Sequence, residues 1–287
     1  PDTLEAHLDI SYAETDHPRQ RLDLLLPKRR TKDKLPVIAI IHGGAWRAGD
    51  KRAVLPRLFP LLASGEYAGV SIGYRLSSDA AWPAQIHDCK AAIRWIRGNA
   101  DKYGLDPEKI GVMGWSAGGH LVAMLGVAGN APELEGDLGR YDSLSSAVTC
   151  VVDQYGPTEL LTMGDYESKM DHNAPDSPES LLIGGPILEN KDKAKAASPI
   201  TYVDKDDAPC FIVHGTKDPL VPYPQSKTFH AALQKAGVES YLQTMVGGGH
   251  GGFRNPQLDE RIAAFFAKHL LGKQVAIESD PLPAVAP

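Results

Sequence analysis

A short segment near the middle of the chain places the strongest constraint on what it can fold into. Residues 110–113 have the apolar character of a buried strand, and they run directly into 114–118, which reads G-W-S-A-G. An apolar stretch with helical character follows at 121–127. Strand, G-x-S-x-G turn and helix in this order are typical of a nucleophile elbow, in which glycine is needed on both sides of the serine because side chains there would meet neighbouring backbone. The pattern predicts that Ser116 is a catalytic nucleophile.

Composition and net charge limit which classes of molecule the protein is expected to bind. The chain has 287 residues, of which 43% are hydrophobic and 23% charged, enough for one large α/β domain. The formal net charge of −6 argues against nucleic acid or an anionic membrane as the main partner. No apolar run approaches the roughly 18 residues that a membrane-spanning helix needs. We therefore expect a small-molecule substrate, with no nucleic-acid and no membrane partner; the sequence leaves the oligomeric state open.

The cysteines favour buried free thiols. Cys89, Cys150 and Cys210 are far apart, each lies in an apolar stretch, and no C-x-x-C occurs, so neither a zinc cluster nor a dense disulfide scaffold is indicated. A single disulfide with one free thiol is the alternative. The sequence begins at Pro1 rather than Met, which slightly favours a secreted or periplasmic protein over a cytoplasmic one, since a removed segment could have been a signal peptide.

Strands and helices alternate through most of the chain. The unbroken β-branched run at 37–41 predicts a central strand buried on both faces, and the early strands predict a hairpin at the sheet edge. We expect strands at 7–12, 22–26, 37–41, 69–73, 110–113, 148–155, 211–213 and 241–246, and helices at 54–62, 84–97, 121–127, 225–236 and 259–270. The alternation predicts a single α/β domain over residues 1–271, with a mostly parallel, doubly wound, eight-stranded sheet and helices on both faces.

Two segments depart from this rhythm. Residues 156–199 are long, polar and rich in Pro and Gly, and a loop of this length in a compact domain is usually functional. We interpret them as a small lid-like insertion that faces the substrate, with a disordered surface loop as the alternative. Residues 272–287 form a C-terminal tail whose Pro- and Ala-rich end has no apolar face, so disorder is expected there.

A serine nucleophile requires a base and a carboxylate that orients the base, in the chain order serine, acid, histidine. Asp218 lies in a tight Gly- and Pro-rich loop just after the expected strand 211–213, at the end of a parallel strand where open sheets hold their functional residues. Asp153, inside an earlier strand, is the main alternative. Three other carboxylates precede the strand and therefore lie at its wrong end: Asp204, Asp206 and Asp207.

The histidine should follow the last core strand. Residues 247–252 read G-G-G-H-G-G between the strand 241–246 and the closing helix, and such a glycine-rich loop suits a histidine that must reach over the nucleophile. We assign the base to His250. His120 lies one turn into the helix after Ser116, and His214 ends a strand, so both are expected to be structural.

The oxyanion that forms during acyl transfer needs preorganised N–H donors. One is expected from Ala117, at the start of the helix after the nucleophile, where the helix dipole also helps. The others are assigned to Gly44 and Ala45 in the loop after strand 37–41, with Gly43 as the neighbour that could displace either. His42 is expected to lock this loop by hydrogen bonding.

Three aromatic residues are candidates for the substrate pocket: Trp46, Trp115 and Tyr155. Trp46 could instead be an ordinary core residue. No cluster of His, Cys and carboxylate residues has the spacing of a metal site, so we expect neither a metal nor another cofactor.

The motifs together resemble the α/β-hydrolase fold over about residues 20–270. Within that fold, they are similar to the hormone-sensitive-lipase-like esterases and to the carbohydrate-associated, bifunctional acetylxylan/feruloyl esterases. The residues that carry the resemblance are H-G-G-A-W at 42–46, G-D-K at 49–51, G-W-S-A-G-G-H at 114–120 and H-G-T-K-D at 214–218. Ala45 departs from the usual third glycine, and the short N-terminal region departs from the helical cap of the lipase-like enzymes.

The leading hypothesis is a serine carboxylesterase, a carboxylic ester hydrolase that acts on short-chain or aromatic acyl esters through an acyl-enzyme on Ser116. The resemblance extends it to acetyl or feruloyl esters of plant polysaccharide. The alternative within enzymes is an amide hydrolase, similar to kynurenine formamidases or to prolyl-oligopeptidase-like peptidases. The alternative from another class is a catalytically silent α/β-hydrolase that serves as a binding module.

Overall fold

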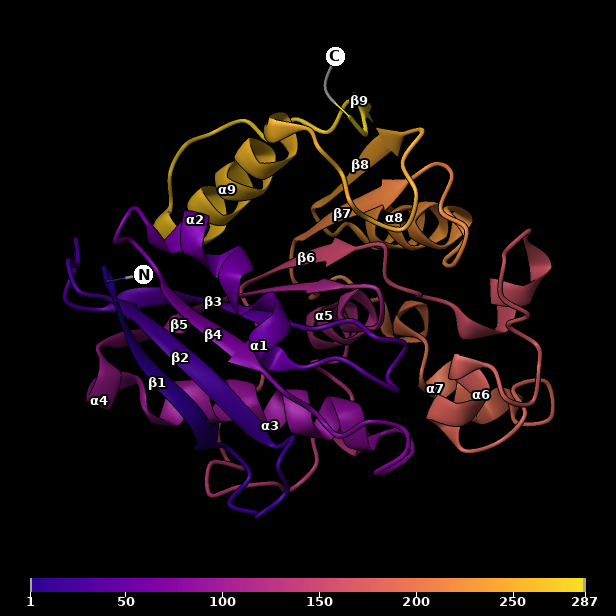
Figure 1. The fold of residues 1–287 in the computed structure, drawn as a ribbon, viewed down its shortest axis with the longest axis horizontal. Coiled ribbons are helices and arrows are strands. Elements are labelled where there is room, and N and C mark those ends of the chain that lie inside the picture. Colours follow the sequence, from indigo (N-terminus) through magenta and orange to yellow (C-terminus); the bar gives the residue numbers. More distant parts are fainter. Residues whose placement is uncertain (1, 286–287) are drawn as a thin grey trace.

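The computed structural model describes residues 2–285, and within that range nine strands form one sheet in the order β1-β2-β4-β3-β5-β6-β7-β8-β9 (Figure 1). The strands are β1 (Leu4–Ser11), β2 (Arg21–Pro27), β3 (Leu35–Ile41), β4 (Ala68–Ile72), β5 (Leu105–Trp115), β6 (Cys150–Gln154), β7 (Cys210–Gly215), β8 (Ser240–Val246) and β9 (Leu282–Pro283). β1 pairs with β2, and β2 with β4, in antiparallel fashion. Every pair from β4 to β9 is parallel. The expected edge hairpin and parallel centre are both present.

Helices cover both faces of the sheet (Figure 1). One face is covered by α3 (Ala84–Gly98), α5 (Ala117–Val127) and α8 (Pro224–Ala236). The other face is covered by α1 (Lys51–Val54), the 3-10 helix η1 (Leu55–Leu58), α2 (Phe59–Leu62) and α9 (Pro256–Leu271). The short elements α4 (Ala100–Tyr103) and η2 (Pro132–Leu134) lie in connections.

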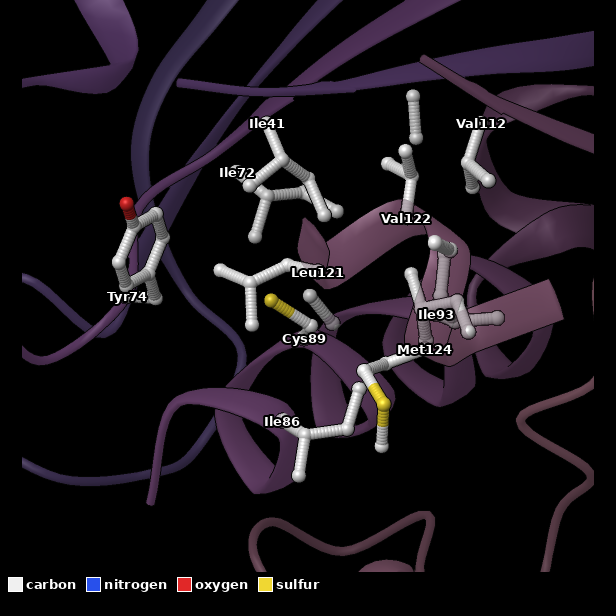
Figure 2. Close-up of a cluster of buried hydrophobic side chains, with 14 of the residues drawn as sticks. Ile41, Ile72, Tyr74, Ile86, Cys89, Ile93, Val112, Leu121, Val122 and Met124 are labelled. Carbon is white, nitrogen blue, oxygen red and sulfur yellow. The ribbon is translucent and has the colours of Figure 1, made fainter. Parts of the chain in front are cut away.

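The central strand β3 explains how the two cores are divided. Val37, Ala39 and Ile41 belong to the cluster beneath α3 and α5, whereas Ile38 and Ile40 belong to the cluster beneath α9. Successive side chains of a strand point to opposite faces, so a strand with both faces covered needs an unbroken apolar run. Figure 2 shows the first cluster, with side chains from the sheet meeting those of α3 and α5.

The insertion at 156–199 is ordered and has short helices of its own. It contains η3 (Leu160–Asp165), α6 (Pro178–Ile183) and α7 (Lys191–Ala196), and η4 (Pro199–Tyr202) leads back to the sheet. Leu182 and Ile183 are buried in the same core cluster as α3 and α5. This burial explains why the segment is not the disordered loop that was the alternative, and Figure 1 shows α6 and α7 together beyond the carboxyl end of the sheet.

Two expectations need correction at the C-terminus. The described part of the sheet has nine strands rather than eight, because β9 pairs with β8. The tail 272–287 was expected to be disordered, yet Leu282 is buried and Arg261 of α9 pairs with Asp280 at 2.7 Å. A two-residue strand has no periodicity, so its pairing depends on contacts with α9 and β8 that the local sequence does not reveal. Residues 286–287 lie outside the described range.

All three cysteines are buried and free, and no disulfide joins residues of the described range. Between residues 2 and 285, no helix has both the length and the apolar character that crossing a membrane requires.

Candidate active site

Four loops meet at one edge of the sheet because four parallel strands end there. The loop after β3 holds residues 42–46, Ser116 directly follows the last residue of β5, and the loops after β7 and β8 hold Asp218 and His250. Carboxyl ends of parallel strands lie on the same side of a sheet, and this is where open α/β sheets bind their ligands. The topology therefore gathers residues that are more than a hundred positions apart.

The serine lies in a strained turn. Ser116 has φ 54° and ψ −120°, a backbone conformation that side-chain-bearing residues rarely adopt. A Cβ atom added to Gly114 would come within 2.2 Å of the Gly118 carbonyl oxygen, and one added to Gly118 within 2.2 Å of the Ile41 carbonyl oxygen. The glycines therefore allow β5, α5 and β3 to approach closely, and the serine hydroxyl is held at the end of the strand.

The histidine and the aspartate are within hydrogen-bond distance of that serine. Nε2 of His250 lies 2.9 Å from Oγ of Ser116, and Nδ1 of His250 lies 2.7 Å from Oδ2 of Asp218. With the carboxylate accepting a hydrogen bond from Nδ1, Nε2 is left as the acceptor for the serine hydroxyl. The geometry is that of a nucleophile, a base and a group that orients the base.

Asp218 is held as a carboxylate. Its side chain is buried, and burial alone would raise the pKa of Asp218, but hydrogen bonds from His214 and His250 outweigh that effect and keep the pKa well below its usual range. Oδ1 also accepts hydrogen bonds from the backbone N–H groups of Leu220 and Val221, at 2.8 and 3.0 Å. Asp218 therefore fixes the shape of its own loop as well as the ring of His250.

The loops that hold the acid and the histidine are joined to each other. The N–H of Lys217 donates to the carbonyl oxygen of Gly248 at 2.8 Å, and a Cβ atom on Gly215 would meet that same oxygen at 2.3 Å. On the far side, a Cβ atom on Gly251 would lie 2.5 Å from the hydroxyl of Tyr155. Glycine in these loops thus permits close packing around His250.

Asp153, the main alternative for the acid, lies elsewhere. It is fully buried beneath the elbow, and its Oδ1 accepts a hydrogen bond from the N–H of Gly156 at 2.9 Å. Desolvation raises the pKa of Asp153 to about 7. The other three carboxylates, Asp204, Asp206 and Asp207, precede β7 and hydrogen bond among their own segment. None of the four pairs with His250.

The loop after β3 lies directly against the serine. A Cβ atom on Gly43 would be 3.3 Å from Cβ of Ser116, and Gly44, Ala45 and Trp46 all have positive φ. Within residues 2–285, no hydrogen-bond acceptor is found for the N–H of Gly44 or Ala45, nor for that of Ala117 at the first position of α5. The same is true of Gly43, the alternative donor. Free N–H groups on both sides of a serine can stabilise an oxyanion.

Two histidines near the site hold the backbone in place. Nδ1 of His42 donates to the carbonyl oxygen of Gly43 at 2.7 Å, and its ring stacks on Tyr74. His120 is fully buried in α5, where it binds Trp46 and the carbonyl oxygen of Ala197. Both contacts are those of structural residues.

A cavity of about 360 Å³ opens beside the serine. All three aromatic candidates, Trp46, Trp115 and Tyr155, line it, although each is more than nine-tenths buried. The opposite wall comes from the insertion and from the loop after Asp218: Met170, His172, Pro178, Glu179, Leu220 and Val221. No spacing or periodicity marks these residues, because they become neighbours only when the insertion docks on the sheet edge.

His172 and Glu179 form a buried pair in that wall. Nδ1 of His172 donates to Oε1 of Glu179 at 3.0 Å, and Nε2 donates to the carbonyl oxygen of Leu220 at 2.9 Å. Burial alone would lower the pKa of His172, but the hydrogen bond and charge of Glu179 outweigh it and raise the pKa. The pair fastens the insertion to the loop that begins with Asp218.

Metal ligands do not gather anywhere in the described range: no three His, Cys, Asp or Glu side chains between residues 2 and 285 are placed to hold an ion. The arrangement of Ser116, His250 and free N–H groups is suited to acyl transfer by the chain's own residues.

The sheet topology and the position of the G-x-S-x-G turn define an α/β-hydrolase fold. The chain belongs to the BD-FAE family, which matches residues 22–233.

The relatives and solved structures that are similar to this chain include named esterases. Esterase LipQ of Mycobacterium tuberculosis (strain ATCC 25618 / H37Rv) is 36% identical over 234 residues, covering 80% of this chain and 52% of LipQ. A truncated carbohydrate esterase from gut microbiota has a TM-score of 0.85 and 36% identity, covering 94% of this chain and 98% of that one. A bifunctional GH43-CE protein of Bacteroides eggerthii also has a TM-score of 0.85, with 37% identity over 92% of this chain and 35% of its own. The chain spans about half the length of the curated relatives that it matches.

Proposed function

We propose that this protein is a carboxylesterase of the serine hydrolase type, with Ser116 as nucleophile, His250 as base and Asp218 as the group that orients the base. The observation that carries the proposal is the 2.9 Å distance from Nε2 of His250 to Oγ of Ser116. The esterase names of the relatives support the same class of reaction.

The first half of the reaction forms an acyl-enzyme. Oγ of Ser116 attacks the ester carbonyl carbon while Nε2 of His250 takes the hydroxyl proton, and Asp218 stabilises the imidazolium that results. The negative charge on the carbonyl oxygen is bound by the N–H groups of Ala117 and of Gly44 and Ala45. When the tetrahedral intermediate collapses, His250 gives its proton to the leaving alcohol oxygen.

The second half releases the acid. Water attacks the acyl carbon, His250 takes a proton from that water, and the same N–H groups stabilise the second oxyanion. The intermediate then expels Oγ of Ser116, which recovers its proton from His250. Each proton that leaves one oxygen is returned to another, so the cycle needs no co-reactant besides water.

We further propose short-chain or aromatic acyl groups, including acetyl and feruloyl esters of plant polysaccharide, as substrates. The cavity beside Ser116 measures about 360 Å³ and is walled by aromatic and apolar side chains, which suits a compact acyl group. The similarity to a carbohydrate esterase and to a bifunctional GH43-CE protein supports the polysaccharide-linked substrate.

One experiment tests the reaction and the nucleophile together. Wild-type protein is assayed with p-nitrophenyl acetate, treated with a phosphonate that labels active serines, and mapped by mass spectrometry; Ser116→Ala is treated in parallel. We expect hydrolysis and a single label at Ser116 in the wild type, and a loss of kcat on the order of 10⁴-fold in the variant. Label at another residue, or activity retained by Ser116→Ala with its fold intact, would overturn the proposal.

A further inference from the structure

Residues 247–253, here called the histidine loop, have little intrinsic preference for one shape. Five of the seven are glycine, and glycine has more conformational freedom to lose on ordering than any other residue. His250 must nevertheless stay 2.9 Å from Oγ of Ser116 and 2.7 Å from Oδ2 of Asp218. A displacement of about 1 Å at such a group can lower a rate on the order of 100-fold. The position of the histidine loop therefore depends on contacts with other segments.

The loop after β7 supports the first part of the histidine loop. The N–H of Gly247 donates to Oγ1 of Thr216 at 2.9 Å, and the carbonyl oxygen of Gly248 accepts from Lys217 at 2.8 Å. Beyond the histidine, no backbone hydrogen bond joins Gly252 to another segment within residues 2–285. The second part of the loop needs a different support.

That support comes from residues 280–285, here called the C-terminal strap. The N–H of Ala284 donates to the carbonyl oxygen of Val246 at 3.0 Å, just before the histidine loop. The carbonyl oxygen of Ala284 accepts from the N–H of Arg254 at 2.7 Å, just after the loop. The side-chain amide of Asn255 also donates to the carbonyl oxygen of Pro283 at 2.9 Å. A single residue of the strap thus joins the two ends of the histidine loop.

The strap also packs on the loop itself. A Cβ atom on Gly248 would lie 3.1 Å from Cβ of Ala284 and 2.7 Å from the ring of Phe253. The Phe253 ring packs edge-on against Tyr155, with 5.9 Å between centroids, and the Tyr155 ring packs against His250 at 4.7 Å. Contacts therefore run without a break from the strap to the imidazole.

The strap is in turn anchored to β8 and α9, the two elements that flank the histidine loop in the chain. Leu282 is only 5% exposed and pairs with Met245 of β8. The carboxylate of Asp280 pairs with Arg261 of α9 at 2.7 Å, and its carbonyl oxygen accepts from Nε2 of Gln243 at 3.0 Å. These contacts give the strap a fixed position from which it can hold the loop.

We propose that the C-terminal strap positions His250, and that Ala284 is a positioning residue that acts through its backbone N–H and carbonyl groups. The inference rests on the proposed ester hydrolysis. With the strap bound, the histidine loop keeps the one shape in which His250 reaches both Ser116 and Asp218. Without these hydrogen bonds the loop samples other shapes, and only a fraction of the molecules is competent. We expect kcat to fall by that fraction and KM to change little, because residues 280–285 do not line the cavity beside Ser116.

The experiment measures the mobility of the loop and the activity separately. Ala284→Pro removes the N–H that binds Val246. Ala276→Pro is the matched control, because Ala276 is exposed in the same tail and its N–H has no acceptor within residues 2–285. Leu282→Ala loosens the strap through its buried side chain, and Ile277→Ala is its control, a partly buried residue upstream of the strap. Hydrogen exchange followed by mass spectrometry reports on amides 247–254, and p-nitrophenyl acetate gives kcat and KM.

We expect amides 247–254 to lose most of their protection in Ala284→Pro and Leu282→Ala, and kcat to fall at least about tenfold with KM within about threefold. Both controls should stay within about twofold of the wild type in kcat and keep their protection. Urea unfolding identifies a strap variant that does not fold, and the other variant then decides.

A loop that is unprotected in the wild type, or equally protected in both strap variants, would overturn the inference. So would a loss of protection that leaves kcat unchanged. If the wild type does not hydrolyse p-nitrophenyl acetate, the proposed function fails, and the exchange rates alone decide whether the strap holds the loop.

Discussion

Nε1 of Trp46 donates a hydrogen bond to Nδ1 of His120 across 3.2 Å, and this contact joins the loop after β3 to the helix after Ser116. The other ring nitrogen of His120 donates to the carbonyl oxygen of Ala197, at the end of the insertion, at 2.7 Å. Burial lowers the pKa of His120 to about 4, so the ring is neutral at neutral pH and can accept from one partner while donating to the other. One imidazole thus connects three segments that surround the serine.

His120→Leu is expected to destabilise the protein by about 2–4 kcal/mol, because it leaves the buried Trp46 N–H and the Ala197 carbonyl unpaired. kcat should fall as well, since the loop that carries Gly44 and Ala45 loses a support. Urea unfolding and p-nitrophenyl acetate kinetics measure the two effects. His230→Leu, at a half-buried histidine on α8, is the control, and equal losses in both variants would contradict the role given to His120.

Activity is expected to rise with pH and then level off, as a single group in the enzyme loses its proton. Nε2 of His250 must be free of a proton to accept one from Ser116, so the enzyme with a protonated base is inactive. Asp218 adds no second step, because its hydrogen bonds keep the pKa of its carboxyl well below the usual range. A plot of log kcat/KM against pH should have a limiting slope of one. A slope of two, or activity that declines as the pH rises toward neutrality, would count against the assignment.

The preferred acyl groups are expected to be short or compact. Met170, Pro178 and Val221 line the cavity of about 360 Å³ beside Ser116. Each additional CH₂ group could contribute roughly 0.8 kcal/mol if a groove continued past them, so specificity constants should instead fall beyond about six carbons. A series of p-nitrophenyl esters from acetate to laurate measures this. A steady increase in kcat/KM along the series would show that a long acyl groove exists.

Asp153→Asn is expected to stabilise the protein more at pH 8 than at pH 5. Desolvation raises the pKa of Asp153 from 3.8 to about 7 in the folded protein. Between about pH 4 and 7 the folded state holds a proton that the unfolded state has released, so the wild-type residue lowers stability progressively as pH rises through that window. Asparagine carries no charge at either pH. The gain relative to wild type should therefore increase by about 1–3 kcal/mol from pH 5 to pH 8.

Urea unfolding at the two pH values checks this difference. Asp142→Asn provides the matched control, because Asp142 is exposed and should show no comparable change with pH. A gain for Asp153→Asn that is the same at both pH values would mean that the buried carboxyl is not the cause.

Much of the fold can be predicted from local patterns in the sequence. The β-branched run of β3 indicates a strand covered on both faces, and Val37 and Ile38 do point into different cores. The chain order of Ser116, Asp218 and His250 singles out three residues that the fold brings within hydrogen-bond distance. Their catalytic roles remain a prediction, but their proximity follows from a simple rule: parallel strands end on the same edge of a sheet.

Other features depend on contacts between segments with no pattern of their own. His172 and Glu179 become a wall of the cavity only because the insertion folds onto the loop after Asp218. β9 forms because Leu282 and Pro283, near the C-terminus, pair with the edge strand β8.

The sequence by itself determined the strand and helix pattern and the elbow, and it predicted the residues for acyl transfer, since these rest on backbone preferences and on the chemistry of single side chains. The tertiary structure alone decided that His120 joins three segments, that Asp153 is buried away from His250, and that His172 and Glu179 line the cavity beside the serine. The way in which distant elements pack decides what surrounds a polar side chain and whether it has a hydrogen-bond partner there. That docking depends on the packing of the whole chain.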